Sequence, residues 1–197
     1  MEQDLIIEML YLFLVSLIFA GLEVQVEGKN GWASQLPTWR PKDRGYFSKI
    51  YRLLLFGKDV TLYHLLIFTL LLAVLHYPYF AGKGWDINQE LATLSLFFLL
   101  SVVWDFLWFV INPHYGLFRF KKGNIWWHKK WFLFMPLDYW LGLAVSCLFY
   151  TRFFLSPILL KEWLTIFFLF SILTLAVIVF AALFKKLNPA PFGSKSS

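Results

Sequence analysis

One acid lies inside an apolar run that is long enough to cross a membrane. Asp105 belongs to the stretch 91–113, LATLSLFFLLSVVWDFLWFVINP. An ionised Asp at the centre of a spanning helix costs roughly 2.5–3.5 kcal/mol on insertion scales, so it usually faces a partner or a wet cavity. Trp108 and Asn112 follow at three and seven residues, which places all three side chains on one helix face. We therefore expect Asp105 to belong to a functional site.

Two further acids have a spacing that calls for a cation. Glu23 and Glu27 are four residues apart and share a face if the first helix continues that far. Like charges at this spacing repel each other unless a basic group or a metal intervenes, and Arg40 is a local candidate for the basic group. Carboxylates with imidazoles bind Zn, Fe or Mn, whereas carboxylates alone suit Mg. Alternatively, two acids in different surroundings divide acid and base roles without a metal.

The expected site combines these acids with polar and aromatic residues that the chain brings to the same end of its spans. A divalent metal is a permitted cofactor, with Glu23, Glu27, His64 and His128 as its candidate ligands. The predicted catalytic residues are Asp105, Asn112, His64, Glu23 and Glu27, and the predicted substrate-binding residues are Trp108, Trp32, Trp39, Arg40, His128 and Asp138.

Structural roles compete with each of these functional ones. Glu23, Glu27, His128 and Asp138 could be solvated at the interface or paired with nearby basic residues. Asp105 could form an internal ion pair or hydrogen bond with a Trp, a Tyr or His64 that only locks the bundle.

Composition places the chain among integral membrane proteins. Of its 197 residues 59% are hydrophobic, the mean hydropathy is +0.63 and only 15% are charged, against about 25% in soluble domains. Several runs approach the roughly 20 apolar residues that cross a bilayer core. We predict an all-α, polytopic helical membrane bundle that forms one domain over residues 1–187, followed by a disordered tail over 188–197.

Five spans and one interfacial helix account for the apolar runs. Asp59 is the predicted N-cap of the second span, and Asp86 with Gln89 forms a capping-box-like start for the third, which ends at Asn112. Residues 46–56 have the pattern of a short amphipathic helix on the membrane surface. The other predicted spans cover residues 5–22, 60–80, 137–155 and 162–184.

The basic residues lie mainly on one side of this topology. Fifteen of the 18 Lys and Arg fall in the loops after the first and third spans and in the tail, and only Lys83, Arg152 and Lys161 fall on the other side. The positive-inside rule therefore predicts an N-terminus outside and a C-terminus in the cytoplasm. We expect the membrane to be a prokaryotic cytoplasmic (inner) membrane. Because the basic residues flank spans, the expected partners are anionic phospholipid headgroups rather than nucleic acid.

Several classes of site are excluded by missing motifs. The chain has no Walker A or G-x-G-x-x-G loop, no H-E-x-x-H and no G-x-S-x-G. Its single cysteine, Cys147, permits no intramolecular disulfide and no Cys-based zinc or iron–sulfur site. Four histidines are too few for the usual histidine-rich di-iron arrangement of membrane desaturases.

Three segments carry a resemblance to known sequences: EGKNGWASQLPTWR, WDFLWFVINPHYG and IWWHKKW. Together they resemble an uncharacterised family of small prokaryotic polytopic membrane proteins, over about residues 23–131. The resemblance implies that these segments belong to one site, and it implies no established activity.

The preferred hypothesis is a small integral membrane enzyme whose cytoplasm-facing polar pocket acts on a lipid or isoprenoid-type substrate. The first alternative is a transporter or channel component with a polar path through the bundle. Few polar residues are present to form that path, because between Glu8 and Glu23 the first span contains only Tyr11 and Ser16. The second alternative is a non-catalytic membrane assembly protein.

Overall fold

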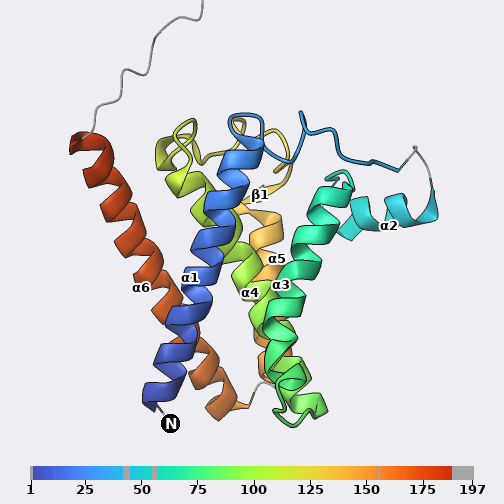
Figure 1. Ribbon diagram of the computed structural model, residues 1–197, viewed down its shortest axis with the longest axis vertical. Helices are drawn as coiled ribbons and strands as arrows, with labels where there is room; N and C mark the ends of the chain where they lie inside the picture. The colour runs from blue at the N-terminus through green and yellow to red at the C-terminus, as the bar shows by residue number, and fades with distance from the viewer. Residues whose placement is uncertain (1, 42–44, 55–56, 155, 188–197) are drawn as a thin grey trace, which may run out of the picture.

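The computed structural model describes residues 2–41, 45–54, 57–154 and 156–187, and it is an all-α bundle with almost no sheet (Figure 1). This architecture confirms the predicted fold class. A 3-10 turn, η1 (Leu117–Arg119), and a two-stranded antiparallel hairpin, β1 (Trp131–Phe132) and β2 (Met135–Pro136), interrupt the loop between two of the helices. The helices are α1 (Glu2–Glu27), α2 (Tyr46–Leu54), α3 (Leu62–Phe80), α4 (Ile87–Ile111), α5 (Leu137–Tyr150) and α6 (Pro157–Leu187).

Among the described residues, four helices are long and apolar enough to cross a bilayer: α1, α3, α4 and α6. The fifth predicted span is shorter than predicted, because α5 has 14 residues and ends at Tyr150 in a turn rather than at residue 155. At 1.5 Å per residue it is about 21 Å long, less than a hydrocarbon core of about 30 Å. The direction of the chain nevertheless alternates through α1, α3, α4, α5 and α6 (Figure 1).

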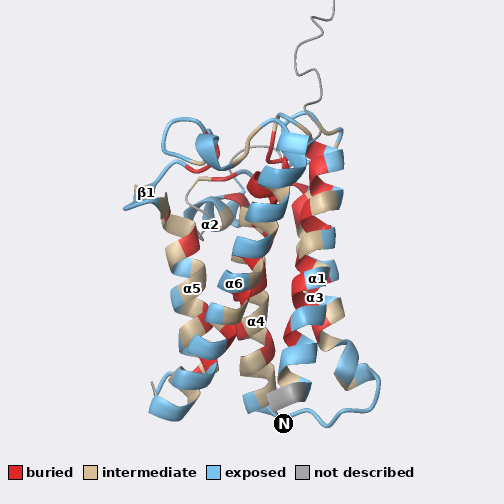
Figure 2. Ribbon diagram, turned by 90° about the vertical axis from the view of Figure 1, so that its left-hand side faces the viewer, coloured by how far each residue is buried: buried red, intermediate tan, exposed pale blue. Residues whose placement is uncertain are grey.

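Helix α4 lies at the centre of the bundle and contacts α1, α3, α5 and α6. Its Leu99, Leu100, Leu107 and Phe109 are fully buried. The outer helix α6 instead exposes many large apolar side chains along its length, as a lipid-facing helix does (Figure 2). Because α4 is surrounded, a polar group on it meets several other segments of the chain.

Two helix boundaries differ from the prediction and bear on the site. Helix α1 continues to Glu27, beyond the predicted end at residue 22, and so carries both Glu23 and Glu27. Thr61, and not the predicted Asp59, is the N-cap of α3, since its hydroxyl accepts the backbone N–H of His64.

The other predicted cap is confirmed. Asp86 accepts the backbone N–H groups of Asn88 and Gln89 at the start of α4. These bonds stabilise its ionised form and lower the pKa of its carboxyl. At the other end of α4, Asn112 is the C-cap just before Pro113, as predicted.

The predicted surface helix is present as α2, a strongly amphipathic helix with Arg52 in its last turn. Arg52 forms an ion pair of 2.7 Å with Asp59, which lies two residues before the N-cap of α3. The end of the predicted helix at residues 55–56 and the predicted disordered tail at 188–197 lie outside the described residues.

Candidate functional site

Two groups of buried or half-buried polar side chains lie at the end of the bundle where α1 and α4 end and α3 and α5 begin (Figure 1). We call the first the charged chain: Asp105, His128, Asp138 and Lys58. We call the second the Glu–His cluster: Glu23, Glu27 and His64. The carboxylate of Glu23 interacts electrostatically with that of Asp105, so the two groups are neighbours.

The charged chain alternates in sign from one residue to the next. His128 Nε2 donates to Asp105 Oδ2 at 3.2 Å, and His128 Nδ1 donates to Asp138 Oδ2 at 3.1 Å. Lys58 Nζ forms an ion pair with Asp138 Oδ2 at 2.6 Å. Ionised carboxylates only accept hydrogen bonds, so a histidine between two of them carries protons on both nitrogens. Two negative and two positive charges then balance.

Asp105 is the most accessible member of this chain. Its side chain remains 28% exposed, whereas the His128 side chain has no exposed surface. Besides the imidazole, Asp105 Oδ2 accepts the phenol O–H of Tyr139 at 2.5 Å. The carboxylate on the central helix is therefore held by two donors and still has a free face.

The Glu–His cluster brings two helices together. Glu23 and Glu27 lie on adjacent turns of α1, and His64 lies in the first turn of α3. His64 Nε2 is 3.5 Å from Glu27 Oε1 and 3.9 Å from Glu23 Oε1. All three residues are buried, and one ligand atom from each lies within 4.8 Å of the others. Three of the four predicted metal ligands, Glu23, Glu27 and His64, therefore lie together. The fourth, His128, lies between Asp105 and Asp138 instead.

The segment after α1 closes over this cluster. Its Trp32 ring stacks on the His64 imidazole at 3.9 Å, and its indole N–H donates to the carbonyl of Asp59 at 2.9 Å. Lys58 Nζ lies 4.6 Å from the centre of the same ring. Trp32 and Ala33 both have positive φ, of 48° and 49°, a conformation that costs energy for residues with a Cβ and tends to occur at functional sites.

Trp32 is thus the one predicted aromatic residue that touches the Glu–His cluster directly. Trp108 is buried against Trp127 and Tyr115 instead. Trp39 is 56% exposed, and its carbonyl accepts the backbone N–H of Leu62. Neither of these two side chains joins the described contacts of the charged chain.

Arg40 does not neutralise Glu23 and Glu27 as predicted. Its guanidinium donates to the backbone carbonyls of Ala33, Leu36 and Thr38 and so braces the loop that carries Trp32. The backbone N–H of Ala33 in turn donates to Glu27 Oε1. The arginine supports the cluster only through the backbone.

Asn112 has a structural role in the geometry observed. Its Nδ2 donates to the carbonyl of Gly28 at 2.8 Å, and its Oδ1 accepts the backbone N–H of His114 at 2.9 Å. The side chain is completely buried and ties the end of α4 to the end of α1. It positions the segments around the site rather than facing the charged chain.

Replacing Asn112 with alanine tests that role. The change removes the two hydrogen bonds to Gly28 and His114, each worth about 0.5–1.5 kcal/mol. We expect a lower melting temperature in detergent, followed by circular dichroism. Asn124→Ala is the control, because the side-chain amide of Asn124 is exposed and makes one hydrogen bond of 3.3 Å to the carbonyl of Arg119. An equal loss of stability in both variants would contradict the role of Asn112 in joining α4 to α1.

Three residues of the site were not predicted from the sequence: Lys58, Tyr139 and Thr61. Lys58 looked like one of many loop cations, and nothing in its spacing indicated burial beside Asp138. Tyr139 directly follows Asp138. Two adjacent polar residues at a predicted helix start were the only feature of the sequence that could have indicated a role for Tyr139. Thr61 lies three residues before His64, the spacing of a cap to its first turn.

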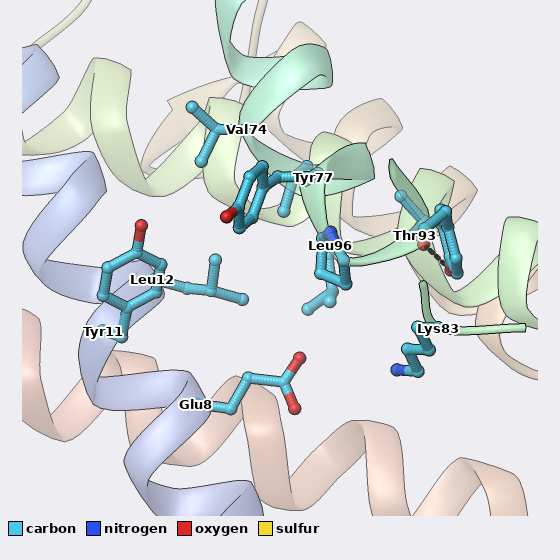
Figure 3. A pocket seen from close by; sticks show the side chains of 11 residues that line it. Glu8, Tyr11, Leu12, Val74, Tyr77, Lys83, Thr93 and Leu96 are labelled. Atoms are coloured by element: carbon cyan, nitrogen blue, oxygen red, sulfur yellow. Dashed lines mark hydrogen bonds between the residues drawn. The ribbon is translucent and has the colours of Figure 1, made fainter. Parts of the chain in front are cut away.

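Two cavities in the described part of the chain lie elsewhere than the predicted cytoplasm-facing pocket around these residues. One cavity lies at the opposite end of the bundle, where Glu8 and Lys83 border it with Tyr11 and Tyr77 (Figure 3). The other is a shallow basic depression lined by Lys29, His114, Tyr115, Arg119 and Asn124. Access to the charged chain is instead through the exposed face of Asp105.

No protein-family model, no curated protein and no solved structure matches the chain. The resemblance to a family of small prokaryotic membrane proteins stays a prediction.

Proposed function

We propose that the protein is a small integral membrane enzyme that acts on a lipid or isoprenoid-type substrate, with Asp105 as its general base. The observation that carries this proposal is a carboxylate on a membrane-spanning helix that remains 28% exposed while its partners are buried. Ionisable groups at such positions are expensive, and they are usually retained for a function.

The charged chain suits proton transfer at Asp105. His128 and Tyr139 donate to Oδ2 of Asp105, so this carboxylate stays ionised and can accept a proton from a bound substrate at its free face. Asp138 and Lys58 fix the orientation of the imidazole. In this reaction Asp105 is the catalytic residue, and His128, Tyr139 and Asp138 are positioning residues.

A lipid substrate fits the setting of this base. The carboxylate lies on a helix of the apolar bundle, where a substrate with a long hydrocarbon part is already dissolved at high local concentration. A basic depression of Lys29, His114 and Arg119 at the same end of the bundle supports the binding of anionic headgroups there. The fifteen basic residues favour the cytoplasmic side for this end, with the N-terminus outside.

Asp105→Asn tests the proposal because it keeps the shape of the side chain and removes the base. General acid–base catalysis contributes about 10²–10⁴-fold, so we expect the variant to lose at least 100-fold of any lipid conversion. The measurement is mass spectrometry of the whole lipid extract from cells that express the wild-type protein, the variant or an empty vector.

Glu162→Gln is the matched control, because that acid lies near the opposite end of the bundle, bonded to Tyr150. Membrane insertion and gel-filtration profiles establish that all proteins are folded. The proposal is wrong if folded Asp105→Asn changes the lipid profile as fully as the wild type does.

Transport ranks second as a proposal. A polar path would have to connect Glu8 with Glu23 along α1, where Ser16 is buried but bonds to the backbone carbonyl of its own helix. The core of the bundle is built from apolar side chains, among them Leu12, Phe13 and Leu100. A non-catalytic assembly role ranks third, and it predicts that partner binding survives Asp105→Asn.

A further inference from the structure

We infer that Glu23, Glu27 and His64 form a binding site for one divalent transition-metal ion of the zinc, manganese or iron class. This inference goes beyond the proposed acid–base chemistry at Asp105 and does not depend on it. It rests on the donor set, on the geometry, on the charge of the cluster and on the groups that surround it.

The geometry is close to that of a metal site. Ligand atoms at about 2.1 Å from a tetrahedral ion lie about 3.4 Å apart. His64 Nε2 is 3.5 Å from Glu27 Oε1 and 3.9 Å from Glu23 Oε1, and all three ligand atoms lie within 4.8 Å of one another. A shift of a few tenths of an ångström per side chain would bring them to an ion.

The charge of the cluster calls for a cation. In the charged chain two carboxylates are balanced by His128 and Lys58. In the Glu–His cluster two buried carboxylates face a single imidazole, and Lys58, the nearby cation, is already bonded to Asp138 at 2.6 Å. Among the described residues, the contacts of Glu23 and Glu27 include no lysine or arginine within ion-pair distance. A divalent ion would remove the repulsion of the two acids.

The surroundings of His64 resemble those of a metal ligand. Histidines that bind metals usually donate their second ring N–H to a fixed acceptor. His64 Nδ1 lies 2.7 Å from the Thr61 hydroxyl oxygen, which can accept from it and leave the lone pair of Nε2 directed at the two carboxylates. Trp32 stacked on the ring prevents it from turning away.

One buried donor also points into the cluster. The Trp104 side chain is 3% exposed and its indole nitrogen is directed at the Glu23 carboxylate, yet it makes no hydrogen bond of normal geometry. An unpaired buried N–H is uncommon in a finished structure. A carboxylate shifted toward a metal, or a water bound to the metal, would give it a partner. Imidazole with two carboxylates and an open position suits zinc, manganese or iron better than magnesium.

The test is metal binding by the whole protein purified in detergent. We expect one equivalent of Zn²⁺ or Mn²⁺ per chain after loading and gel filtration, measured by plasma mass spectrometry, and its removal by a chelator. Electron paramagnetic resonance of added Mn²⁺ gives the affinity of the wild-type protein without any substitution. Glu27→Gln and His64→Asn should each weaken binding at least 100-fold.

Controls come from the opposite end of the bundle, where His76 and Glu90 form a contact of the same residue types at 3.2 Å. His76→Asn and Glu90→Gln should bind metal like the wild type. The inference is overturned if the wild-type protein binds less than 0.1 equivalent at about 100 μM free metal. It is also overturned if folded Glu27→Gln and His64→Asn keep full affinity. Because none of these readouts uses activity, their failure leaves the role of Asp105 open to its own test.

Discussion

His128→Ala should destabilise the protein by about 3–5 kcal/mol, the cost of removing one partner from a buried ion pair. The imidazole has no exposed surface and lies between two carboxylates, at 3.2 Å from Asp105 and 3.1 Å from Asp138. Without it, Asp138 keeps Lys58, whereas the Tyr139 hydroxyl is the one remaining hydrogen-bond donor to Asp105 among the described residues. The free energy of unfolding in detergent, from titration with a denaturing surfactant, measures the loss.

Two companion variants show whether charge or packing is responsible. His114→Ala removes an exposed histidine of the neighbouring loop and should change stability by less than about 0.5 kcal/mol. Adding Asp105→Asn to His128→Ala removes the stranded charge, so the double variant should regain part of the loss. A loss below 1 kcal/mol for His128→Ala would mean that the charged chain is not a coupled unit.

The sequence was most informative where one residue broke a clear pattern. Asp105 stood out because it interrupts a long apolar run, and the structure places it in a network of buried partners. Glu23 and Glu27 stood out through their spacing, which indicates a shared face once α1 is known to reach residue 27. Local rules also gave the cap at Asp86 and the helical architecture, since both depend on neighbours in the chain.

The contacts missed are those that depend on long-range packing. Lys58 and Asp138 are 80 positions apart in the chain yet 2.6 Å apart in space, and no periodicity relates a loop cation to a distant helix start. The same holds for Asn112, which lies in line with Asp105 by helical spacing but bonds to Gly28 and His114. Arg40 was predicted to neutralise Glu23 and Glu27 because of its charge. Its guanidinium instead donates to the backbone carbonyls of its own loop.

The second large effect is expected at Gly31, in the segment that holds Trp32 over His64. Gly31→Ala would place a Cβ 2.3 Å from Cη2 of the Trp127 ring, at a residue whose φ is +63°. That ring is stacked on Phe109 and packed edge-on against Trp108, so it has no room to retreat. Overpacking costs about 1–3 kcal/mol and the left-handed backbone about 1–2 kcal/mol, which gives a total of about 2–5 kcal/mol.

Two other glycines distinguish the cost of overpacking from the cost of the left-handed backbone. Gly28 also has positive φ, of +57°, but an added Cβ would meet nothing within 4 Å, so Gly28→Ala should lose only the backbone term. Gly84 has neither constraint, and Gly84→Ala should be close to neutral. Gly84→Ala should therefore have the highest melting temperature of the three variants, Gly28→Ala an intermediate one and Gly31→Ala the lowest.

The glycine series also connects the fold to the Glu–His cluster. If the close approach of Gly31 to Trp127 is what seats Trp32 on His64, Gly31→Ala should disturb that stacked pair even where the helices survive. A folded Gly31→Ala protein should then bind Mn²⁺ more weakly than Gly28→Ala does. Equal metal affinity in the two variants would mean that His64 is held by Thr61 and the helix start alone, and that the loop is only a cover.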